Sequence, residues 1–285
     1  MPPVPAAQRR AQIAAVFDSV ADEYDNVGVA WFRPIAERLV REIGAAPGER
    51  AVDLGCGRGA ALFALAAAVG PAGRVTGIDL APRMVEATRA GVRARGLPNV
   101  EVHVMDAGAP RLAKAAYDLA VASFVLFLMP APVTVLRAWR ELLVPGGRLG
   151  VSTFTGREGW LDEVFRPYLP PPVFTSGAAG AEDPFDTDEG VEGLFAAAGY
   201  HGIRTASADL DVVFADVDQW YAWSLSHGQR AVWDRIPAAD RDRVRDAAAR
   251  RLERSRTADG RIRLTQRIRF TLGHRAGAGS IDCTG

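Results

Sequence analysis

Cysteine and histidine are scarce in this sequence, and neither shows the spacing of a metal site or a disulfide framework. The two cysteines are Cys56, inside a glycine-rich turn, and Cys283, near the C-terminal end. The four histidines are scattered, at positions 103, 201, 227 and 274. Structural zinc sites need closely spaced Cys and His pairs, and disulfide-stabilised domains need several cysteines. We therefore predict a protein without a metal centre and without stabilising disulfides.

The chain also lacks a charge excess and a long apolar run. Lys+Arg and Asp+Glu both number 34, so the formal net charge is zero. A nucleic-acid-binding protein usually carries a basic face, and the balanced charge gives no sign of one. The longest apolar run, residues 119–129, is too short to cross a bilayer, and no secretory segment follows Arg9 and Arg10. We predict a cytoplasmic protein that neither binds nucleic acid nor spans a membrane.

What the sequence does contain is a regular alternation of strands and helices. Segments with helical periodicity separate five short apolar segments, at 50–54, 74–79, 100–105, 118–123 and 148–154. This alternation is typical of a parallel sheet covered by helices on both faces. Residues 202–210 and 261–272 are predicted as a sixth and a seventh strand. The predicted fold class is α/β, with ligands bound at the carboxyl ends of the parallel strands.

Composition divides the chain into four parts. Residues 1–45 are predicted to form an N-terminal helical lid segment, and residues 46–155 a nucleotide-binding core. Residues 156–272 combine the last strands of the sheet with insertions rich in aromatic residues, including a mostly helical insert at 216–256. Residues 273–285 are predicted to be a disordered tail.

A glycine-rich turn follows the first strand and permits two interpretations. The stretch AVDLGCGRGA, at 51–60, fits the dinucleotide fingerprint G-x-G-x-x-A through Gly55, Gly57 and Ala60. It also fits D-x-G-x-G-x-G, starting at Asp53. In both cases the backbone at a helix N-terminus comes close to a ligand. The turn alone leaves NAD(P) and S-adenosylmethionine both open.

Three carboxylates narrow the choice of cofactor. Asp79 ends the second strand about twenty residues after the glycines, where it can accept hydrogen bonds from the ribose hydroxyls of either cofactor. Asp53 precedes the glycines, where it would repel a pyrophosphate but attract the ammonium and sulfonium of S-adenosylmethionine. Asp106 follows the third strand, where it can accept a hydrogen bond from the adenine amino group. An oxidoreductase would also need hydride-transfer residues, and a Tyr-x-x-x-Lys motif is missing because the one lysine is Lys114.

In this order the motifs resemble those of class I S-adenosylmethionine-dependent methyltransferases of small molecules, a group with menaquinone, ubiquinone and natural-product members. The matching segments lie within residues 50–155: VDLGCGRG, GIDLAPRM, MDA, YDLAVASFVLFLM and LVPGGRL. The resemblance implies a Rossmann-like, seven-stranded, mostly parallel sheet whose last strand, 261–272, is antiparallel to the others. It also implies that residues 46–155 bind S-adenosylmethionine and that S-adenosylhomocysteine is the product.

The resemblance further implies a set of cofactor contacts by position in these motifs. These are Tyr24, Asp53, Gly55, Cys56, Gly57, Asp79, Leu80, Met84, Asp106, Ala107, Ser123 and Phe124. In this family a tyrosine in the position of Tyr24 often closes over the cofactor. Cys56 is interpreted as a small residue beside the cofactor, since nothing nearby activates its thiol. Met84 fits helix packing equally well, and Asp79 fits a helix cap as well as a ribose ligand.

Methyl transfer from a sulfonium is mainly a positioning problem, because the methyl group is already activated. An oxygen nucleophile usually needs a base, and the best candidate for a catalytic base is His227, within WYAWSLSHG. A lone histidine near a helix end is more often a surface or capping group. The lack of another convincing base favours methylation of carbon or nitrogen, or catalysis by proximity alone. The acceptor atom stays open among C, N and O.

Aromatic residues outside the core predict a lid around a hydrophobic or aromatic small molecule. The candidate substrate-binding residues are Trp31, Phe32, Trp160, Trp220 and Trp223. We predict a methyltransferase that acts on such a molecule in secondary metabolism, for example in antibiotic biosynthesis. Two alternatives are an NAD(P)-linked oxidoreductase and a non-enzymatic relative that binds a ligand or a partner. The sequence leaves the oligomeric state open, a homo-oligomer included.

Overall fold

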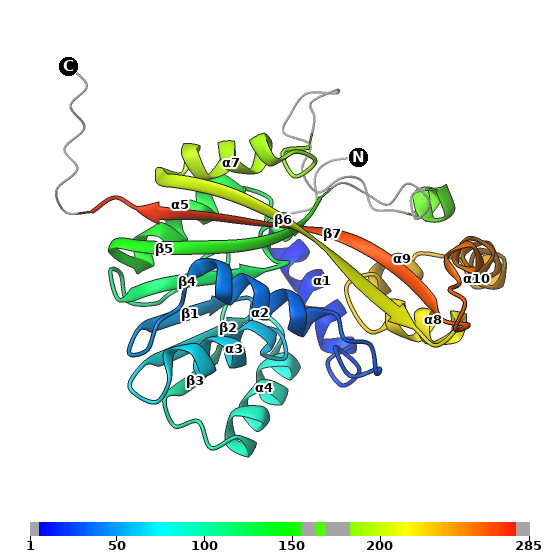
Figure 1. Cartoon of the computed structure of the whole chain (residues 1–285), viewed down its shortest axis with the longest axis horizontal. Helices are drawn as coiled ribbons and strands as arrows, with labels where there is room; N and C mark the ends of the chain where they lie inside the picture. The colour runs from blue at the N-terminus through cyan, green and yellow to red at the C-terminus, as the bar shows by residue number, and fades with distance from the viewer. Residues whose placement is uncertain (1–5, 156–162, 169–182, 278–285) are drawn as a thin grey trace.

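A computed structural model describes residues 6–155, 163–168 and 183–277, and it contains one seven-stranded sheet in the order β3-β2-β1-β4-β5-β7-β6 (Figure 1). The strands are β1 (Arg50–Leu54), β2 (Arg74–Asp79), β3 (Val100–Val104), β4 (Tyr117–Ser123), β5 (Leu143–Phe154), β6 (Tyr200–Phe214) and β7 (Ile262–Arg275). The first five are parallel, and β7 lies antiparallel between β5 and β6. The predicted α/β class and the antiparallel last strand are confirmed.

Helices cover both faces of the sheet. They are α2 (Phe32–Ile43), α3 (Ala60–Val69), α4 (Pro82–Ala94), α5 (Pro132–Leu142) and α7 (Asp188–Ala197), whereas α1 (Ala6–Ser19) packs against α4. On one face, Ala51 and Val121 lie in a core with buried residues of α2 and α3. On the other, Val52 and Ala120 lie in a core with buried residues of α5 and α7. The central strands are therefore buried on both sides, which explains their continuous apolar sequences.

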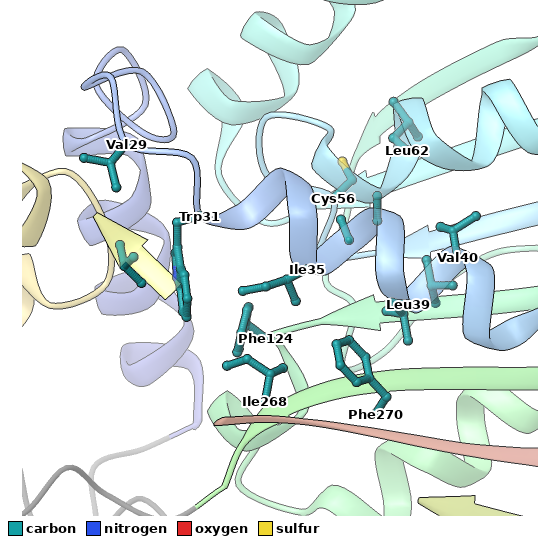
Figure 2. Packing of buried hydrophobic residues seen from close by; sticks show 14 of the residues in the cluster. Val29, Trp31, Ile35, Leu39, Val40, Cys56, Leu62, Phe124, Ile268 and Phe270 are labelled. Carbon is teal, nitrogen blue, oxygen red and sulfur yellow. The ribbon is translucent and has the colours of Figure 1, made fainter. Parts of the chain in front are cut away.

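The structure corrects part of the predicted lid segment at 1–45. Helix α2 buries Ile35, Leu39 and Ile43 against the sheet (Figure 2). It comes so close to β5 that a Cβ on Gly150 would lie 3.1 Å from Leu39 and 3.3 Å from Ile43. The apolar stripe of α2 has the period of a sheet-covering helix, so residues 32–43 belong to the core. Within the described part of this segment, α1 and the loop before α2 are what lie over the strand ends.

The predicted helical insert lies between β6 and β7. It consists of α8 (Val217–Leu225), α9 (Arg230–Trp233) and α10 (Ala238–Leu252). Asp216 caps α8 by accepting a 2.8 Å hydrogen bond from the Gln219 amide, as expected for Asp at this position. Figure 1 shows β6 and β7 extending beyond the other strands to reach these helices. Strand β6 is thus longer than the predicted 202–210.

The predicted tail begins too early at residue 273. Strand β7 continues to Arg275. Gly273 within it is closely packed, since a Cβ on it would lie 2.9 Å from Phe195 and 3.0 Å from Tyr200. The Arg275 guanidinium then donates a 2.6 Å hydrogen bond to the Leu143 carbonyl. Residues 278–285 lie outside the described residues. No helix in the described part of the chain is long and apolar enough to cross a membrane.

Candidate active site

The chain turns sharply between β1 and α3, and two glycines are required there. Gly55 has a φ of 82°, and a Cβ on it would lie 2.5 Å from a Val125 methyl carbon. Gly59 has a φ of 90°, and a Cβ on it would lie 2.7 Å from the Phe63 ring. Only glycine combines a positive φ with so little space. The turn is therefore packed tightly against Val125, just after β4, and against the first turn of α3.

Asp53 is a buried carboxylate that forms no ion pair among the described residues. It is 1% exposed, and neither of its oxygens has a hydrogen-bond partner among the described residues. Burial, and next the nearby Asp79 carboxylate, raise the pKa of Asp53 to about 8. A buried charge is costly unless it is paired, and an approaching cation would pair it. Asp53 thus fits the ammonium and sulfonium of S-adenosylmethionine, and it does not fit a pyrophosphate.

Asp79 holds the turn and the next helix together. Its Oδ2 accepts a hydrogen bond from the Gly57 amide at 2.8 Å, and its Oδ1 accepts one from the Ala81 amide, just before α4, at 2.9 Å. Burial raises the pKa of the Asp79 carboxyl. A carboxylate has about four acceptor sites, so these two bonds leave room for ribose hydroxyls. The cap and the ribose interpretations are compatible, and the ribose contact stays a prediction. Leu80, which follows it, is half-buried.

Asp106 lies beneath helix α1. Its Oδ1 accepts a 2.7 Å hydrogen bond from the Gly108 amide, and its Oδ2 is 3.4 Å from Nε of Arg10. The neighbouring Ala107 is buried, and its carbonyl accepts a 2.7 Å hydrogen bond from the Trp139 indole. The predicted adenine carboxylate is therefore fixed from below by its own loop and approached from above by α1.

Two arginines fix the N-terminal segment over the glycine turn. Nη1 of Arg58, inside the turn, donates to the Ala21 and Asp22 carbonyls at 3.0 and 2.7 Å. Arg83 of α4 pairs with the Asp22 carboxylate at 2.6 Å, and its amide donates to Asp18 at 2.9 Å. The end of α1 and the loop after it are thus held to the glycine turn and to α4, the two elements predicted to border the cofactor.

Tyr24 and Met84 lie where this segment meets the site. The Tyr24 ring comes within 3.9 Å of a Cβ placed on Gly57, and it stacks on Phe32 at 4.5 Å between centroids. Burial, and next the Asp79 charge, raise the pKa of the Tyr24 phenol, which is therefore neutral. Met84 is 1% exposed and packs with Val20 beneath α1. Met84 thus packs in the helix interface, its cofactor contact stays a prediction, and Tyr24 lies over the turn. The Cys56 thiol is buried in the turn with its pKa raised, as expected for an unreactive position.

Phe124 occupies a strained position at the end of β4. Its φ is 58°, in the left-handed region, which costs a residue with a Cβ about 1–2 kcal/mol. Its amide donates to the Ser152 carbonyl at 3.1 Å, and the Ser123 and Ser152 hydroxyls are 2.9 Å apart. Strand β5 therefore anchors the strained turn. Backbone strain of this kind is often found where a functional side chain must be aimed.

Aromatic rings from three distant segments meet at Phe124. Trp31 and Phe32, which begin α2, both lie 6.2 Å from the Phe124 ring centroid. Trp223 of α8 contacts Trp31 edge-on at 6.1 Å. Figure 2 shows Trp31, Phe124 and Ile268 facing one another at the end of the sheet. We call this cluster the aromatic wall; its members are Tyr24, Trp31, Phe32, Phe124, Trp223 and His227.

Of the predicted substrate-binding residues, one lies outside the aromatic wall and another is not described by the structure. Trp220 is 1% exposed and contacts Trp233 edge-on at 6.4 Å, inside the helical insert. That is a core position, because α8 turns Trp220 toward α9 and Trp223 toward Trp31. Trp160 lies outside the described residues.

Sequence reasoning missed one ring beside the wall. Phe154, the last residue of β5, lies 4.6 Å from Phe124 and is 40% exposed. Phe127 lies 6.3 Å from Phe124 and 5.7 Å from Phe154 between ring centroids. The signal that could have identified Phe154 is the pairing of β4 with β5, which places the ends of the two strands side by side.

His227 joins the aromatic wall and is not a surface residue. It lies 4.4 Å from Trp223 and 5.9 Å from Phe32 between ring centroids. Its Nε2 is fully buried, and burial lowers the pKa of His227 to about 4. The imidazole is therefore neutral near pH 7. Its predicted role as a base depends on which ring nitrogen carries the proton.

The arrangement suits a cationic cofactor beside an apolar acceptor. The buried Asp53 carboxyl, which a cation would ionise, lies at the end of β1, and the aromatic wall lies at the neighbouring strand end. No group of three or more metal-ligating side chains occurs in the described ranges. The residues present therefore fit S-adenosylmethionine: Asp53 for its positive groups, Asp79 for its ribose and Asp106 for its adenine.

Comparison with known proteins agrees with this geometry. A family model described as a methyltransferase domain matches residues 51–147. The nocamycin O-methyltransferase of Saccharothrix syringae is 34% identical over 283 residues, which cover 93% of this chain and 99% of that protein. The aklanonic acid methyltransferase DauC of Streptomyces sp. (strain C5) is 39% identical over 160 residues, which cover 56% of this chain and 70% of that protein.

A solved structure shares the fold. The [4+2]-cyclase SpnF superposes with a TM-score of 0.57 at 21% identity, over 96% of this chain and 99% of that one. At this identity the likeness concerns the fold alone. Neither the oxidoreductase nor the non-enzymatic alternative is favoured by these comparisons. With its motifs in register and a relative matched along almost its whole length, the chain belongs to the S-adenosylmethionine-dependent methyltransferases.

Proposed function

We propose that this enzyme methylates an oxygen atom of a hydrophobic, ring-containing small molecule in natural-product biosynthesis. The observation that carries the proposal is the match to a named O-methyltransferase over 93% of the chain. The aromatic wall beside Phe124 supports it, because flat rings stack well on such side chains. The earlier preference for a carbon or nitrogen acceptor, which rested on the lack of a base, gives way to oxygen.

The residues of this chain would act mainly by binding and orienting. S-adenosylmethionine supplies a methyl group already activated on a sulfonium. Asp53 would hold its positive groups, Asp79 its ribose and Asp106 its adenine, while Tyr24 covers the glycine turn. Fixing the acceptor against Phe124 turns a bimolecular reaction into an effectively unimolecular one. The wall also keeps water away from the reacting atoms.

The acceptor oxygen is proposed to be ionised before it binds. In the aromatic wall the titratable side chains are Tyr24 and His227; the phenol of the first is neutral and the imidazole of the second is a poor base. A carboxylic acid has a pKa near 4 and needs no base at pH 7. An acidic enol would serve equally. A phenol with a pKa of about 10 would be a poor acceptor here.

A matched acceptor series tests the proposal. The enzyme is incubated with S-adenosylmethionine and 2-naphthoic acid, 2-naphthol, 2-naphthylamine or indole, and S-adenosylhomocysteine formation is followed by mass spectrometry. We expect turnover with the acid, and a product that mild alkali hydrolyses, as it does an ester. Turnover confined to the amine or to indole carbon would contradict an oxygen acceptor. A parallel titration with S-adenosylhomocysteine and NADH should show binding of the first alone.

We also propose that the enzyme works in the cytoplasm without a nucleic-acid partner. The supporting observation is the balance of 34 basic and 34 acidic residues. The division into a cofactor core near 46–155 and substrate-covering segments on either side, without residues 32–43, is part of the same proposal.

A further inference from the structure

Two buried ring nitrogens of the aromatic wall lack a hydrogen-bond partner in the described part of the chain. Nε1 of Trp223 and Nε2 of His227 are both buried, and neither has a hydrogen-bond partner among the described residues. The two rings are in contact, with centroids 4.4 Å apart and planes at 61°. Buried polar atoms without partners are rare in folded proteins, because each forfeits a hydrogen bond that water would provide. Two of them on touching rings indicate a site that a ligand completes.

The geometry also fixes where the proton of His227 lies. The Gln229 amide donates a hydrogen bond to Nδ1 of His227 at 3.3 Å, so Nδ1 is the bare, accepting nitrogen. A neutral imidazole has one bare and one protonated nitrogen. Since burial keeps this imidazole neutral near pH 7, its proton is on Nε2. Nε2 therefore presents an N–H donor, which is the opposite of what a general base needs.

The donor pair lies within the predicted acceptor site. His227 contacts Phe32, and Phe32 contacts Phe124, the strained residue at the end of β4. Trp223 contacts Trp31, and Trp31 also lies against Phe124. One aromatic ring thus separates each donor from Phe124: the ring of Phe32 for His227 and the ring of Trp31 for Trp223.

We propose that Trp223 and His227 bind one unprotonated oxygen of the substrate through Nε1–H and Nε2–H, and that His227 does not act as a base. This rests on the proposed function. Two N–H donors match a carboxylate or an enolate oxygen, which carries lone pairs, a negative charge and no proton. An ammonium nitrogen has no lone pair to accept these hydrogen bonds, and a neutral hydroxyl oxygen accepts them without the charge that strengthens them. The pair therefore selects acceptors that are ionised before binding and orients them for transfer.

Three variants separate the donor role from a base. Trp223→Phe removes one N–H and keeps an aromatic ring, His227→Phe removes the other, and His227→Gln restores an N–H near Nε2 without a basic nitrogen. Tyr221→Phe, on the same helix as Trp223, is the matched control. The probe is 2-naphthoate, titrated by calorimetry into the enzyme saturated with S-adenosylhomocysteine. A hydrogen bond to a charged group corresponds to about a 10- to 100-fold effect.

We expect Trp223→Phe and His227→Phe to weaken 2-naphthoate binding by about 10- to 100-fold. His227→Gln and Tyr221→Phe should stay within about threefold of the parent, a change below the effect of one hydrogen bond. S-adenosylhomocysteine affinity should be unchanged in all four variants, which shows that the fold is intact. Unchanged naphthoate binding in Trp223→Phe, a His227→Gln variant as weak as His227→Phe, or no binding by the parent would overturn the inference.

The proton position is measured separately and without a ligand. Long-range ¹H–¹⁵N correlation spectra of histidine-labelled enzyme distinguish a protonated Nδ1 from a protonated Nε2. A proton on Nε2 supports the inference, and a proton on Nδ1 overturns it. Failure of the parent to bind S-adenosylhomocysteine would contradict the proposed function instead, and this spectrum would still decide the state of His227.

Discussion

The Asp79 carboxylate lies 2.8 Å from the Gly57 amide, so a side chain at the end of β2 fixes the backbone of the turn that follows β1. The same carboxylate holds the amide before α4 at 2.9 Å. Neighbouring parallel strands end at the same edge of the sheet, which makes this link between sequence-distant residues possible. The shape of the cofactor site therefore depends on Asp79 before any ligand arrives.

Asp79→Ala should weaken S-adenosylhomocysteine binding by at least about tenfold, because it removes a charged acceptor and leaves the Gly57 amide unpaired. Calorimetric titration measures the loss. The matched control is Asp118→Ala, since Asp118 accepts a 2.8 Å hydrogen bond from the Arg50 amide at the opposite ends of the strands. That variant should lower thermal stability and keep the affinity. Equal loss of affinity in both variants would refute a specific role for Asp79.

Cofactor binding should strengthen as the pH rises from 6 to 8. In the free enzyme Asp53, with Asp79 and the Cys56 thiol as its titratable neighbours, has a pKa near 8 and is mostly protonated at pH 6. A cationic ligand favours its ionised form, so binding releases a proton and affinity follows ionisation upward, by at most tenfold per pH unit. Titration of S-adenosylmethionine across this range measures the slope. In the Asp53→Asn variant, the part of the pH dependence of affinity that is due to Asp53 should vanish. An unchanged dependence of affinity on pH would exclude Asp53 as its source.

Asp53 should also make the free enzyme less stable as the pH rises. Its folded pKa of about 8 exceeds an unfolded value near 3.9, so between these values the folded state binds more protons than the unfolded state. The contribution of Asp53 to the free energy of unfolding is therefore present at low pH and is lost as the pH rises through this window, by at most about 1.4 kcal/mol per pH unit. Denaturant titrations should show Asp53→Asn to be more stable than the parent at pH 8 and similar to it at pH 4. A lower stability at pH 8 would contradict the unpaired state of this carboxylate.

Arg58→Ala should loosen the segment that follows α1. The guanidinium bonds to the Ala21 and Asp22 carbonyls are lost, whereas the Arg83 contacts remain. We expect chymotrypsin to cleave faster after Phe17 and Tyr24, and S-adenosylhomocysteine to dissociate faster. Arg50→Ala, which removes an arginine paired with Asp118 at the far edge of the sheet, is the control. Cleavage at the parent rate would mean that Arg83 alone holds the segment.

Phe124→Gly and Phe124→Ala should differ in an unusual direction. Both remove the ring and should reduce methyl transfer, because the aromatic wall loses its centre. The φ of 58° suits glycine and strains alanine, so the glycine variant should be the more stable by about 1 kcal/mol. At an ordinary strand position alanine would be the more stable. Chemical denaturation measures the difference, and a more stable alanine variant would contradict the strained backbone.

Much of the cofactor half could be predicted because its signals are local. The apolar runs of β1, β2 and β4 and the turn glycines each carry their own pattern, so the strands and the turn were placed within a few residues. Strand β6 was predicted too short, since it runs along the sheet edge with half-exposed, mixed residues and shows no continuous apolar run.

The acceptor side depended on contacts between distant segments, which a sequence pattern does not reveal. The approach of Trp31 and Trp223 joins the residue just before α2 to a residue of α8. Phe154 looked like an ordinary strand residue until β4 and β5 were placed side by side. The proton position of His227 follows from one backbone amide, that of Gln229, and only atomic geometry supplies it.

The helical insert connects the end of β6 to the start of β7, at the far end of two strands that project beyond the sheet. The residues proposed to hold the cofactor lie elsewhere, with Asp53 on β1, Asp79 on β2 and Asp106 after β3. Substitutions within α8, α9 and α10 can therefore reshape the acceptor side while the methyl donor keeps its place. For protein engineering, the cofactor-binding part of the chain can be kept constant while the insert is varied. Libraries of variants aimed at new acceptors should therefore be confined to residues 216–256.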